Sequence, residues 1–232
     1  MINVFIVGFN GKMGQLVFEL TKKRSSDWHS YCGFDLTKSK QRCVYTSMEK
    51  LMSDAFTVGG YTDVIIDFSA PSATMEILPF AVEKEIPMVI GTTGFTQEQE
   101  EEIANCAKTI PIFKSDNMAY SSEVFTKLVK QAAKLLPEYE VSIIETPLEE
   151  KHGTLQINYE GDDKLCVSTK RIEHFPTSYM VTIAGANSFI ILQHNFIDRE
   201  IFAEGALNAA KFIVEQTKPG LYSMKDLLKA NK

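Results

Sequence analysis

A short strand-turn-helix pattern at the N-terminus constrains the fold of this chain more than any other feature. VFIVG (residues 4–8) is a β-branched and aromatic run closed by glycine, which is typical of a buried parallel strand. Apolar residues then recur at helical spacing ahead of a Lys-Lys-Arg run, at Met13, Leu16, Val17 and Leu20. A strand followed at once by an amphipathic helix predicts the first unit of an α/β fold.

The same alternation continues through the first half of the chain. Further apolar runs end in small or polar residues, and helix-like segments such as EQEEEIANCAK lie between several of them. These runs are YCGFDL (31–36), VIIDFSAP (64–71), PMVIGTTG (87–94) and PIFKSDN (111–117). The alternation predicts a doubly wound, Rossmann-like parallel sheet, in which ligands bind at the carboxyl ends of the strands.

The turn after the first strand is the clearest binding motif. GFNGKMG places Gly8, Gly11 and Gly14 where a tight turn brings the backbone close to a pyrophosphate. The helix that follows adds N–H groups and a positive dipole end. Strand before and helix after favour dinucleotide binding over a chance cluster of glycines.

Asp35 supports a dinucleotide site. It ends the second predicted strand about 20 residues after the last glycine, where a carboxylate binds the adenosine ribose of NAD. A carboxylate disfavours the extra phosphate of NADP, but Lys38 and Lys40 follow closely, so the choice between NADH and NADPH stays open. The alternative for Asp35 is an aspartate that only caps a turn.

VIGTTGF (89–95) puts two hydroxyl groups between glycines at another strand end. This arrangement suits contact with the nicotinamide or the substrate. The alternative is an ordinary strand-to-helix turn in which Thr96 is the N-cap.

The pattern changes from about Tyr139. Five strand-like runs follow without helices between them: VSIIET, TLQINYEG, KLCVSTKRI, YMVTIAG and FIILQHNFI. They predict a smaller α+β domain with a mostly antiparallel or mixed sheet. His194, with apolar residues close on both sides, is predicted to be a core or interface residue with its hydrogen bonds satisfied.

Helical periodicity returns near the C-terminus, and a last helix that packs on the first domain is expected. The predicted division is a dinucleotide-binding domain of residues 1–117, joined by 204–232, and a second domain of residues 118–203 for substrate binding and oligomerisation.

Composition excludes several classes of function. A net charge of −6 argues against a nucleic-acid surface. The four cysteines include no C-x-x-C pair, so we expect reduced, mostly structural thiols and no metal site. No apolar run approaches a membrane span, and the chain opens directly into INVFIVG without a signal peptide, so we expect a cytoplasmic protein.

Several longer stretches resemble one known family. They are VGFNGKMGQ, VIIDFSAPSAT, VIGTTGF, a looser SDNMAYSSEVF and REIFAEGALNAAKFIVEQTKPGLYSMKDLL, which span the chain in order. Together they resemble the dihydrodipicolinate reductases (4-hydroxy-tetrahydrodipicolinate reductases). The resemblance implies an NAD(P)H-dependent oxidoreductase of lysine and diaminopimelate biosynthesis, which reduces 4-hydroxy-tetrahydrodipicolinate to tetrahydrodipicolinate. It also implies a second domain that carries this small dicarboxylate and builds a homotetramer.

The resemblance also implies site residues. Phe68 falls in the segment near the cofactor, and Thr93 falls where cofactor and substrate meet. Asn117 resembles the asparagine that begins a hinge segment, although the residues after it match only in part. The implied cofactor-binding residues are Gly8, Gly11, Lys12, Met13, Gly14, Asp35, Phe68, Gly91, Thr92 and Asn117.

One loop departs from the family pattern. After the I-I-E strand, family members carry two adjacent histidines, a lysine three residues beyond the second of them, and then D-A-P-S-G-T. Pro147 and Leu148 stand in place of the histidines here, and Lys151 falls on the lysine. The loop is then shortened, because His152 directly precedes Gly153-Thr154.

Reduction of a conjugated imine benefits from a proton donor. The resemblance implies Lys151 as donor and cation, His152 as a substitute donor, and Thr93, Lys151, Gly153 and Thr154 as the groups that bind the substrate. The alternative for this loop is a charged, exposed turn. Two further functions stay open, namely a reductase of a different cyclic imine or carbonyl substrate, and an inactive nucleotide-binding homologue.

Overall fold

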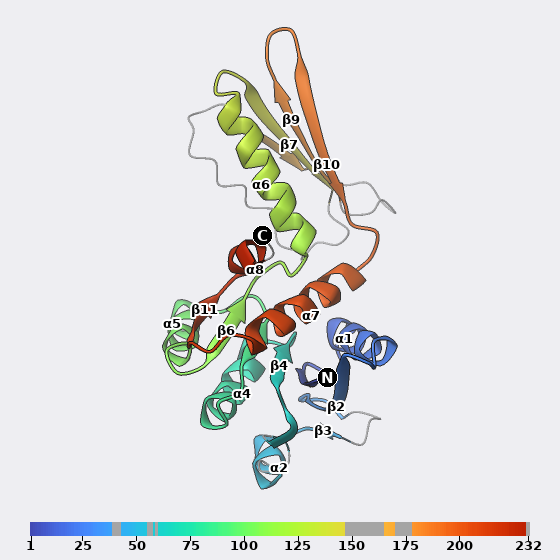
Figure 1. Cartoon of the computed structure of the whole chain (residues 1–232), viewed down its shortest axis with the longest axis vertical. Helices are drawn as coiled ribbons and strands as arrows, with labels where there is room; N and C mark the ends of the chain where they lie inside the picture. Colours follow the sequence, from blue (N-terminus) through green and yellow to red (C-terminus); the bar gives the residue numbers. More distant parts are fainter. Residues whose placement is uncertain (39–42, 55–57, 59, 147–164, 170–177, 231–232) are drawn as a thin grey trace. The chain divides into compact units, whose positions relative to one another are not determined.

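The computed structural model describes residues 1–38, 43–54, 58, 60–146, 165–169 and 178–230. The chain forms two compact units (Figure 1). Unit 1 consists of Met1–Ala119 and Glu200–Lys232, and unit 2 consists of Tyr120–Arg199.

Unit 1 is built on a parallel sheet with the strand order β11-β6-β5-β4-β1-β2-β3. In this order the chain runs outward from β1 in both directions, as in dinucleotide-binding folds, and the predicted Rossmann-like sheet is thereby confirmed. The strands are β1 (Ile2–Val7), β2 (Trp28–Phe34), β3 (Val44–Tyr45), β4 (Val64–Asp67), β5 (Met88–Ile90), β6 (Pro111–Lys114) and β11 (Gly220–Tyr222).

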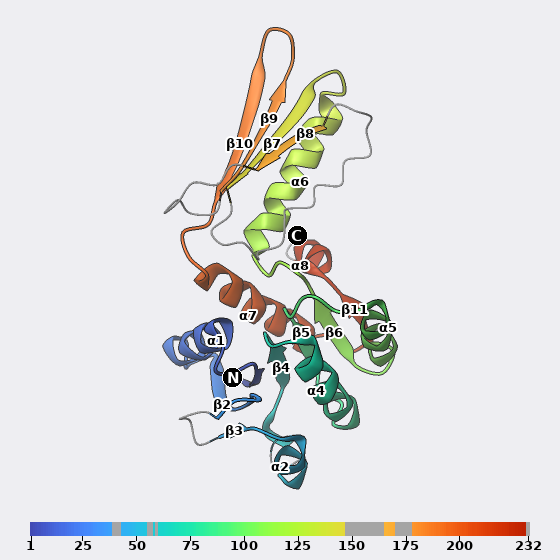
Figure 2. The ribbon, with the colours of Figure 1, turned by 180° about the vertical axis from the view of Figure 1, so that it is seen from behind.

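Helices cover both faces of this sheet. On one face α1 (Lys12–Lys23) lies beside α7 (Glu200–Val214), as Figures 1 and 2 both show. The other face buries one continuous apolar core with α2 (Met48–Ser53), α4 (Pro71–Glu83) and α5 (Gln97–Cys106). Because both faces are covered, the central strands are mostly apolar, which explains the long apolar runs in the sequence.

The C-terminal segment completes unit 1. Helix α7 presents small residues to the sheet, and a side chain at Gly205 would overlap the carbonyl oxygen of Met118. Strand β11 then pairs with β6, and α8 (Met224–Ala230) follows it.

Unit 2 consists of α6 (Tyr120–Leu135) and a four-stranded sheet of order β10-β9-β7-β8. Strand β9 is antiparallel to both neighbours, whereas β8 is parallel to β7, so the predicted mixed sheet is confirmed. Its strands are β7 (Glu140–Thr146), β8 (Leu165–Thr169), β9 (Ser178–Ala184) and β10 (Phe189–Asn195). The strand predicted over residues 154–161 lies outside the described residues.

The two faces of the second sheet differ. Helix α6 covers the face that bears Val181 and Ile183, which are buried. The opposite face of β10 bears Phe189 and Ile191, whose side chains are 66% and 48% exposed. Among the described helices of both units, none is long and apolar enough to cross a membrane.

Candidate functional site

The carboxyl ends of five adjacent strands, β6, β5, β4, β1 and β2, form the candidate site of unit 1. Parallel strands end at the same edge of a sheet, so the residues that follow them lie in one row. The predicted cofactor residues all occupy this row: Gly8, Gly11, Lys12, Met13 and Gly14 after β1, Asp35 after β2, Phe68 after β4, Gly91 and Thr92 after β5, and Asn117 after β6.

The glycine turn has the geometry that close backbone approach requires. Gly8 adopts a φ of 76°, and a Cβ there would lie 2.5 Å from the carbonyl oxygen of Phe68. Gly11 donates its N–H to the Gly8 carbonyl at 3.0 Å and is the N-cap of α1. Gly11 provides no side-chain cap, and the N-terminus of α1, which is the positive end of its dipole, faces the turn.

Asp35 connects two loops of the site. One carboxylate oxygen, Oδ1, accepts hydrogen bonds from the N–H and hydroxyl of Thr37 at 2.8 and 2.6 Å, and Oδ2 accepts the N–H of Asn10 at 2.9 Å. Partial burial acts to raise the pKa of Asp35, but these hydrogen bonds outweigh it and lower the pKa. Asp35 therefore does cap a turn, and it also presents an ionised carboxylate beside the glycine turn.

Phe68 packs between two glycines. Its carbonyl lies against Gly8, and its ring lies so close to Gly91 that any Cβ there would overlap the ring. A larger residue at either glycine would displace Phe68, so the two glycines and the phenylalanine form one fitted surface across β1, β4 and β5.

The site also contains a buried carboxylate, Asp67, that was not predicted from the sequence. Asp67, the last residue of β4, is fully buried. Its Oδ1 accepts the Ser69 N–H at 3.0 Å and hydroxyl at 2.5 Å, together with the Thr92 hydroxyl at 3.0 Å, and its Oδ2 accepts the Thr74 hydroxyl at 2.5 Å. Burial raises the pKa of Asp67, and the hydrogen bonds lower it in part. Asp67 thus holds the loops after β4 and β5 together.

The three threonines after β5 differ in exposure and in their hydrogen bonds. Thr92 is buried, and its hydroxyl is used by Asp67 and by the Ser69 N–H at 2.9 Å. Thr93 is exposed. Thr96 is the N-cap of α5 and forms a capping box with Gln99, as the alternative interpretation of this turn predicted.

Lys114 was not predicted either. It ends β6, and its side chain is only 14% exposed. The ammonium pairs with Glu100 of α5 at 2.9 Å and lies 5.3 Å from the centre of the Phe95 ring. The ion pair fastens the first turn of α5 to the end of β6.

Asn117 lies near the end of the N-terminal part of unit 1. Its side-chain oxygen accepts the Ala119 N–H at 2.9 Å, and its carbonyl accepts the Ser115 hydroxyl at 2.7 Å. The remaining predicted site residues, Lys151, His152, Gly153 and Thr154, lie outside the described residues. Among the described side chains no cluster suited to a metal ion is found.

His194 in unit 2 is partly buried in an aromatic cluster. It stacks on Phe125, meets Phe196 edge-on, and has Nε2 2.9 Å from the Ser121 hydroxyl oxygen. Its Nδ1 is buried and has no partner among the described residues, so the prediction that both nitrogens are satisfied is not met there. Burial lowers the pKa of His194, because a charged ring would lose hydration.

The lowered pKa of His194 predicts acid sensitivity. The folded chain binds a proton at His194 more weakly than the unfolded chain, so acid favours unfolding once the pH falls below about 6.5. We expect calorimetry to show a falling melting temperature as the pH drops from that value toward the lowered pKa. The decline should be smaller in His194→Gln and unchanged in the control His29→Gln, which alters an exposed histidine of unit 1. Equal declines in all three proteins would contradict this role.

Comparison with known proteins identifies the family. Residues 2–118 match the family described as "Dihydrodipicolinate reductase, N-terminus", and residues 122–228 match "Dihydrodipicolinate reductase, C-terminus". The 4-hydroxy-tetrahydrodipicolinate reductase of Caldanaerobacter subterraneus subsp. tengcongensis is 32% identical over 99% of both chains, and that of Alkaliphilus oremlandii is 34% identical over 98% of both.

The chain belongs to the dihydrodipicolinate reductase family.

Membership confirms the family predicted from the sequence, and with it the class of NAD(P)H-dependent oxidoreductase. The fold agrees with that of a solved family member, the dipicolinate-bound dihydrodipicolinate reductase from Paenisporosarcina sp. TG-14. That structure shares 21% identity with this chain, a TM-score of 0.75, and coverage of 96% of this chain and 97% of the other.

The alignment with the Caldanaerobacter reductase spans 262 positions, whereas the chain described here has 232 residues. At least 30 aligned positions therefore have no residue in this chain. The chain aligns with 99% of this relative but lacks some of the segments that the relative contains.

Proposed function

We propose that this protein reduces 4-hydroxy-tetrahydrodipicolinate to tetrahydrodipicolinate, with NADH or NADPH as the hydride source. The observation that supports this function best is the row of site residues along five strand ends in a chain that matches the reductase family from end to end. The fitted surface of Gly8, Phe68 and Gly91 at these strand ends forms only because two of the residues are glycine, since a Cβ at either position would meet Phe68.

Each part of unit 1 has a role in this proposal. The glycine turn, with Lys12 and Met13, binds the pyrophosphate, and Asp35 binds the adenosine ribose. Phe68, Gly91, Thr92 and Asn117 border the nicotinamide, and the exposed Thr93 reaches the substrate. When bound, the nicotinamide supplies the hydride.

We assign substrate binding to residues 118–203. In this proposal Lys151 attracts a substrate carboxylate and donates the proton that follows hydride addition. Gly153 and Thr154 hold a carboxylate, and His152 is a second donor.

A coupled assay tests the function. Dihydrodipicolinate synthase generates the unstable substrate in place, and the fall in NADH or NADPH absorbance is followed after adding the wild-type protein. We expect oxidation that depends on both the synthase reaction and this protein. Tight NADH binding without turnover would contradict the proposed substrate and would favour a different cyclic imine or carbonyl substrate, or an inactive homologue.

Asp35 predicts a preference for NADH. Its lowered pKa keeps it ionised at neutral pH, where it accepts ribose hydroxyls and repels a 2′-phosphate. Asp35→Asn keeps an oxygen for Thr37 but removes the charge. We expect its NADH affinity to fall about tenfold and its affinity for NADPH to rise. Isothermal titration of both cofactors measures this, with Asp27→Asn, a surface aspartate before β2, as the control. An unchanged ratio of affinities would remove Asp35 from cofactor selection.

We also propose that the protein is a homotetramer assembled through unit 2. The exposed face of β10, with Phe189 and Ile191, supports this, because apolar side chains gathered on one face of a sheet are typical of an interface. Light scattering should show that Phe189→Glu combined with Ile191→Glu lowers the molecular mass. Leu221→Glu, which changes an exposed residue of unit 1, should leave the mass unchanged. A tetramer that survives the double substitution would place the interface elsewhere.

A further inference from the structure

Two cysteines of unit 1 lie opposite each other in neighbouring strands. Strands β2 and β3 are parallel, with Gly33 paired to Val44 and Phe34 paired to Tyr45. Gly33 donates its N–H to the Cys43 carbonyl at 3.0 Å, so the ladder extends to the residue before β3. Stepping this register back by one residue places Cys32 opposite Cys43.

Both cysteine side chains point to the same face of the sheet. Opposite residues of a strand pair share a face, and so do residues two apart along a strand. Phe34 and Tyr45 contribute to the same apolar core, and each follows one of the cysteines by two residues. Neighbouring strands lie about 4.8 Å apart, which is within the Cα separation of about 4.4–6.8 Å found in disulfides.

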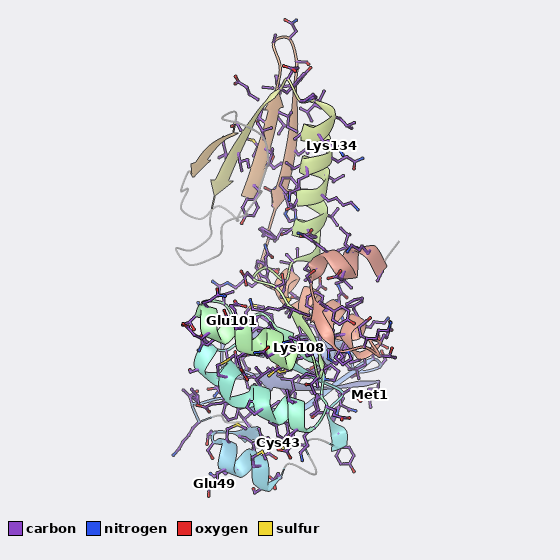
Figure 3. All side chains as sticks on the ribbon, turned by 90° about the vertical axis from the view of Figure 1, so that its left-hand side faces the viewer. Met1, Cys43, Glu49, Glu101, Lys108 and Lys134 are labelled. Carbon is purple, nitrogen blue, oxygen red and sulfur yellow. The ribbon has the colours of Figure 1, made fainter. Side chains whose placement is uncertain are left out.

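The two thiols differ in exposure. Cys32 is buried in the core, whereas Cys43 is exposed. Figure 3 labels Cys43 together with Glu49 of α2. Burial, together with the smaller effects of the nearby Cys43 thiol, raises the pKa of Cys32 to about 12. Neither thiol is in a disulfide.

We propose that Cys32 and Cys43 form an oxidation site, at which a hydroperoxide converts the pair to an intramolecular disulfide. The exposed Cys43 sulfur attacks the peroxide first, giving a sulfenic acid and one molecule of water when the oxidant is hydrogen peroxide. The Cys32 sulfur then attacks the Cys43 sulfur. The S–S bond forms, hydroxide leaves, and the proton from Cys32 completes a second water. The two thiols lose two electrons, and the peroxide gains them.

The site lies next to the proposed ribose-binding residue. Asp35 falls within the ring of residues 32–43 that the disulfide would close, and its N–H already bonds to the Tyr45 carbonyl at 3.0 Å. The disulfide would therefore fix strands that are already paired. We expect NADH affinity to be kept and the melting temperature to rise by several degrees, because the bond restricts the unfolded chain.

Peroxide treatment of the full-length protein, followed by thiol alkylation and peptide mapping, tests the site. We expect Cys32 and Cys43 in one linked pair of peptides, and a rise in melting temperature that dithiothreitol reverses. The bond should form faster as the pH rises, because the Cys32 thiolate becomes more abundant. Cys106→Ser, which alters a cysteine outside the pair, should behave as the wild type does.

Single substitutions separate the two chemical steps. Cys32→Ser should leave a Cys43 sulfenic acid that a 1,3-diketone traps, and the exposed-site variant Cys43→Ser should leave Cys32 reduced. Accumulation of Cys43 sulfinic acid in the wild type while Cys32 stays reduced would overturn the proposal. Covalent dimers in place of the internal bond would overturn it as well. Loss of the proposed reductase activity has no bearing on these readouts.

Discussion

Replacing Lys151 with alanine is expected to lower kcat by about 10²–10⁴-fold, the usual contribution of a positioned acid. The family's histidine pair is absent from this chain, where Pro147 and Leu148 stand in its place. The proposed site therefore depends more heavily on its lysine. KM should also rise, because the same ammonium attracts a substrate carboxylate. The coupled assay with saturating NADH measures both constants.

Two variants distinguish the roles of Lys151. Lys151→Arg keeps the positive charge but releases its proton far less readily, so KM should stay near the wild-type value while kcat falls. Lys130→Ala, which removes an exposed lysine from α6, is the matched control and should change neither constant. Activity retained in Lys151→Ala but lost in His152→Gln would transfer the donor role to His152.

Replacing Asp67 with alanine is expected to lower the free energy of unfolding of unit 1 by at least about 3 kcal/mol. The substitution leaves three hydroxyls and the Ser69 N–H without their shared acceptor in a site closed to water. NADH affinity should fall as well, because the loops after β4 and β5 lose the group that holds them together. Trp28 is the single tryptophan of the chain and is buried in unit 1, so its fluorescence during urea unfolding reports this loss.

An exposed aspartate provides the comparison for Asp67. Asp63 also accepts two hydrogen bonds, from the N–H and side-chain amide of Asn3, but it does so at the surface. Asp63→Ala should therefore cost about 1 kcal/mol and leave NADH binding intact. Asp67→Asn should fall between the two, because an amide keeps one acceptor oxygen. Equal losses for Asp63→Ala and Asp67→Ala would show that burial of the network carries no special weight.

The fold of unit 1 could be predicted because parallel strands covered by helices on both faces appear in the sequence as apolar runs. Val64–Asp67 is buried at every position and is apolar up to its last residue, and the glycine turn marks the first crossover. Strand β11 escaped prediction because it is three residues long and Leu221 within it is exposed. Helix α6 was also missed, although Phe125, Val129 and Ala133 recur every fourth residue.

The parts of the site that were missed depend on partners distant in sequence. Asp67 was passed over in favour of the adjacent Phe68, because Thr74 and Thr92, which donate to it, lie 7 and 25 residues away. The Cys32–Cys43 pair shows no C-x-x-C spacing and becomes visible only through the register of β2 and β3. Lys151 remains a prediction from resemblance, since its loop lies outside the described residues.

During synthesis of this chain, unit 1 stays incomplete until its C-terminal segment has been made. A ribosome completes residues 1–119 and must then make all of unit 2 before α7 emerges. Until then α1 and the strands β4, β5 and β6 lack the helix that packs on them, and β6 lacks its neighbour β11. A nascent chain therefore carries uncovered apolar surface and an open sheet edge, both of which favour aggregation. Unit 1 is therefore the first to begin synthesis and the last to be completed, so we expect a prematurely released chain to be a substrate for chaperones and proteases.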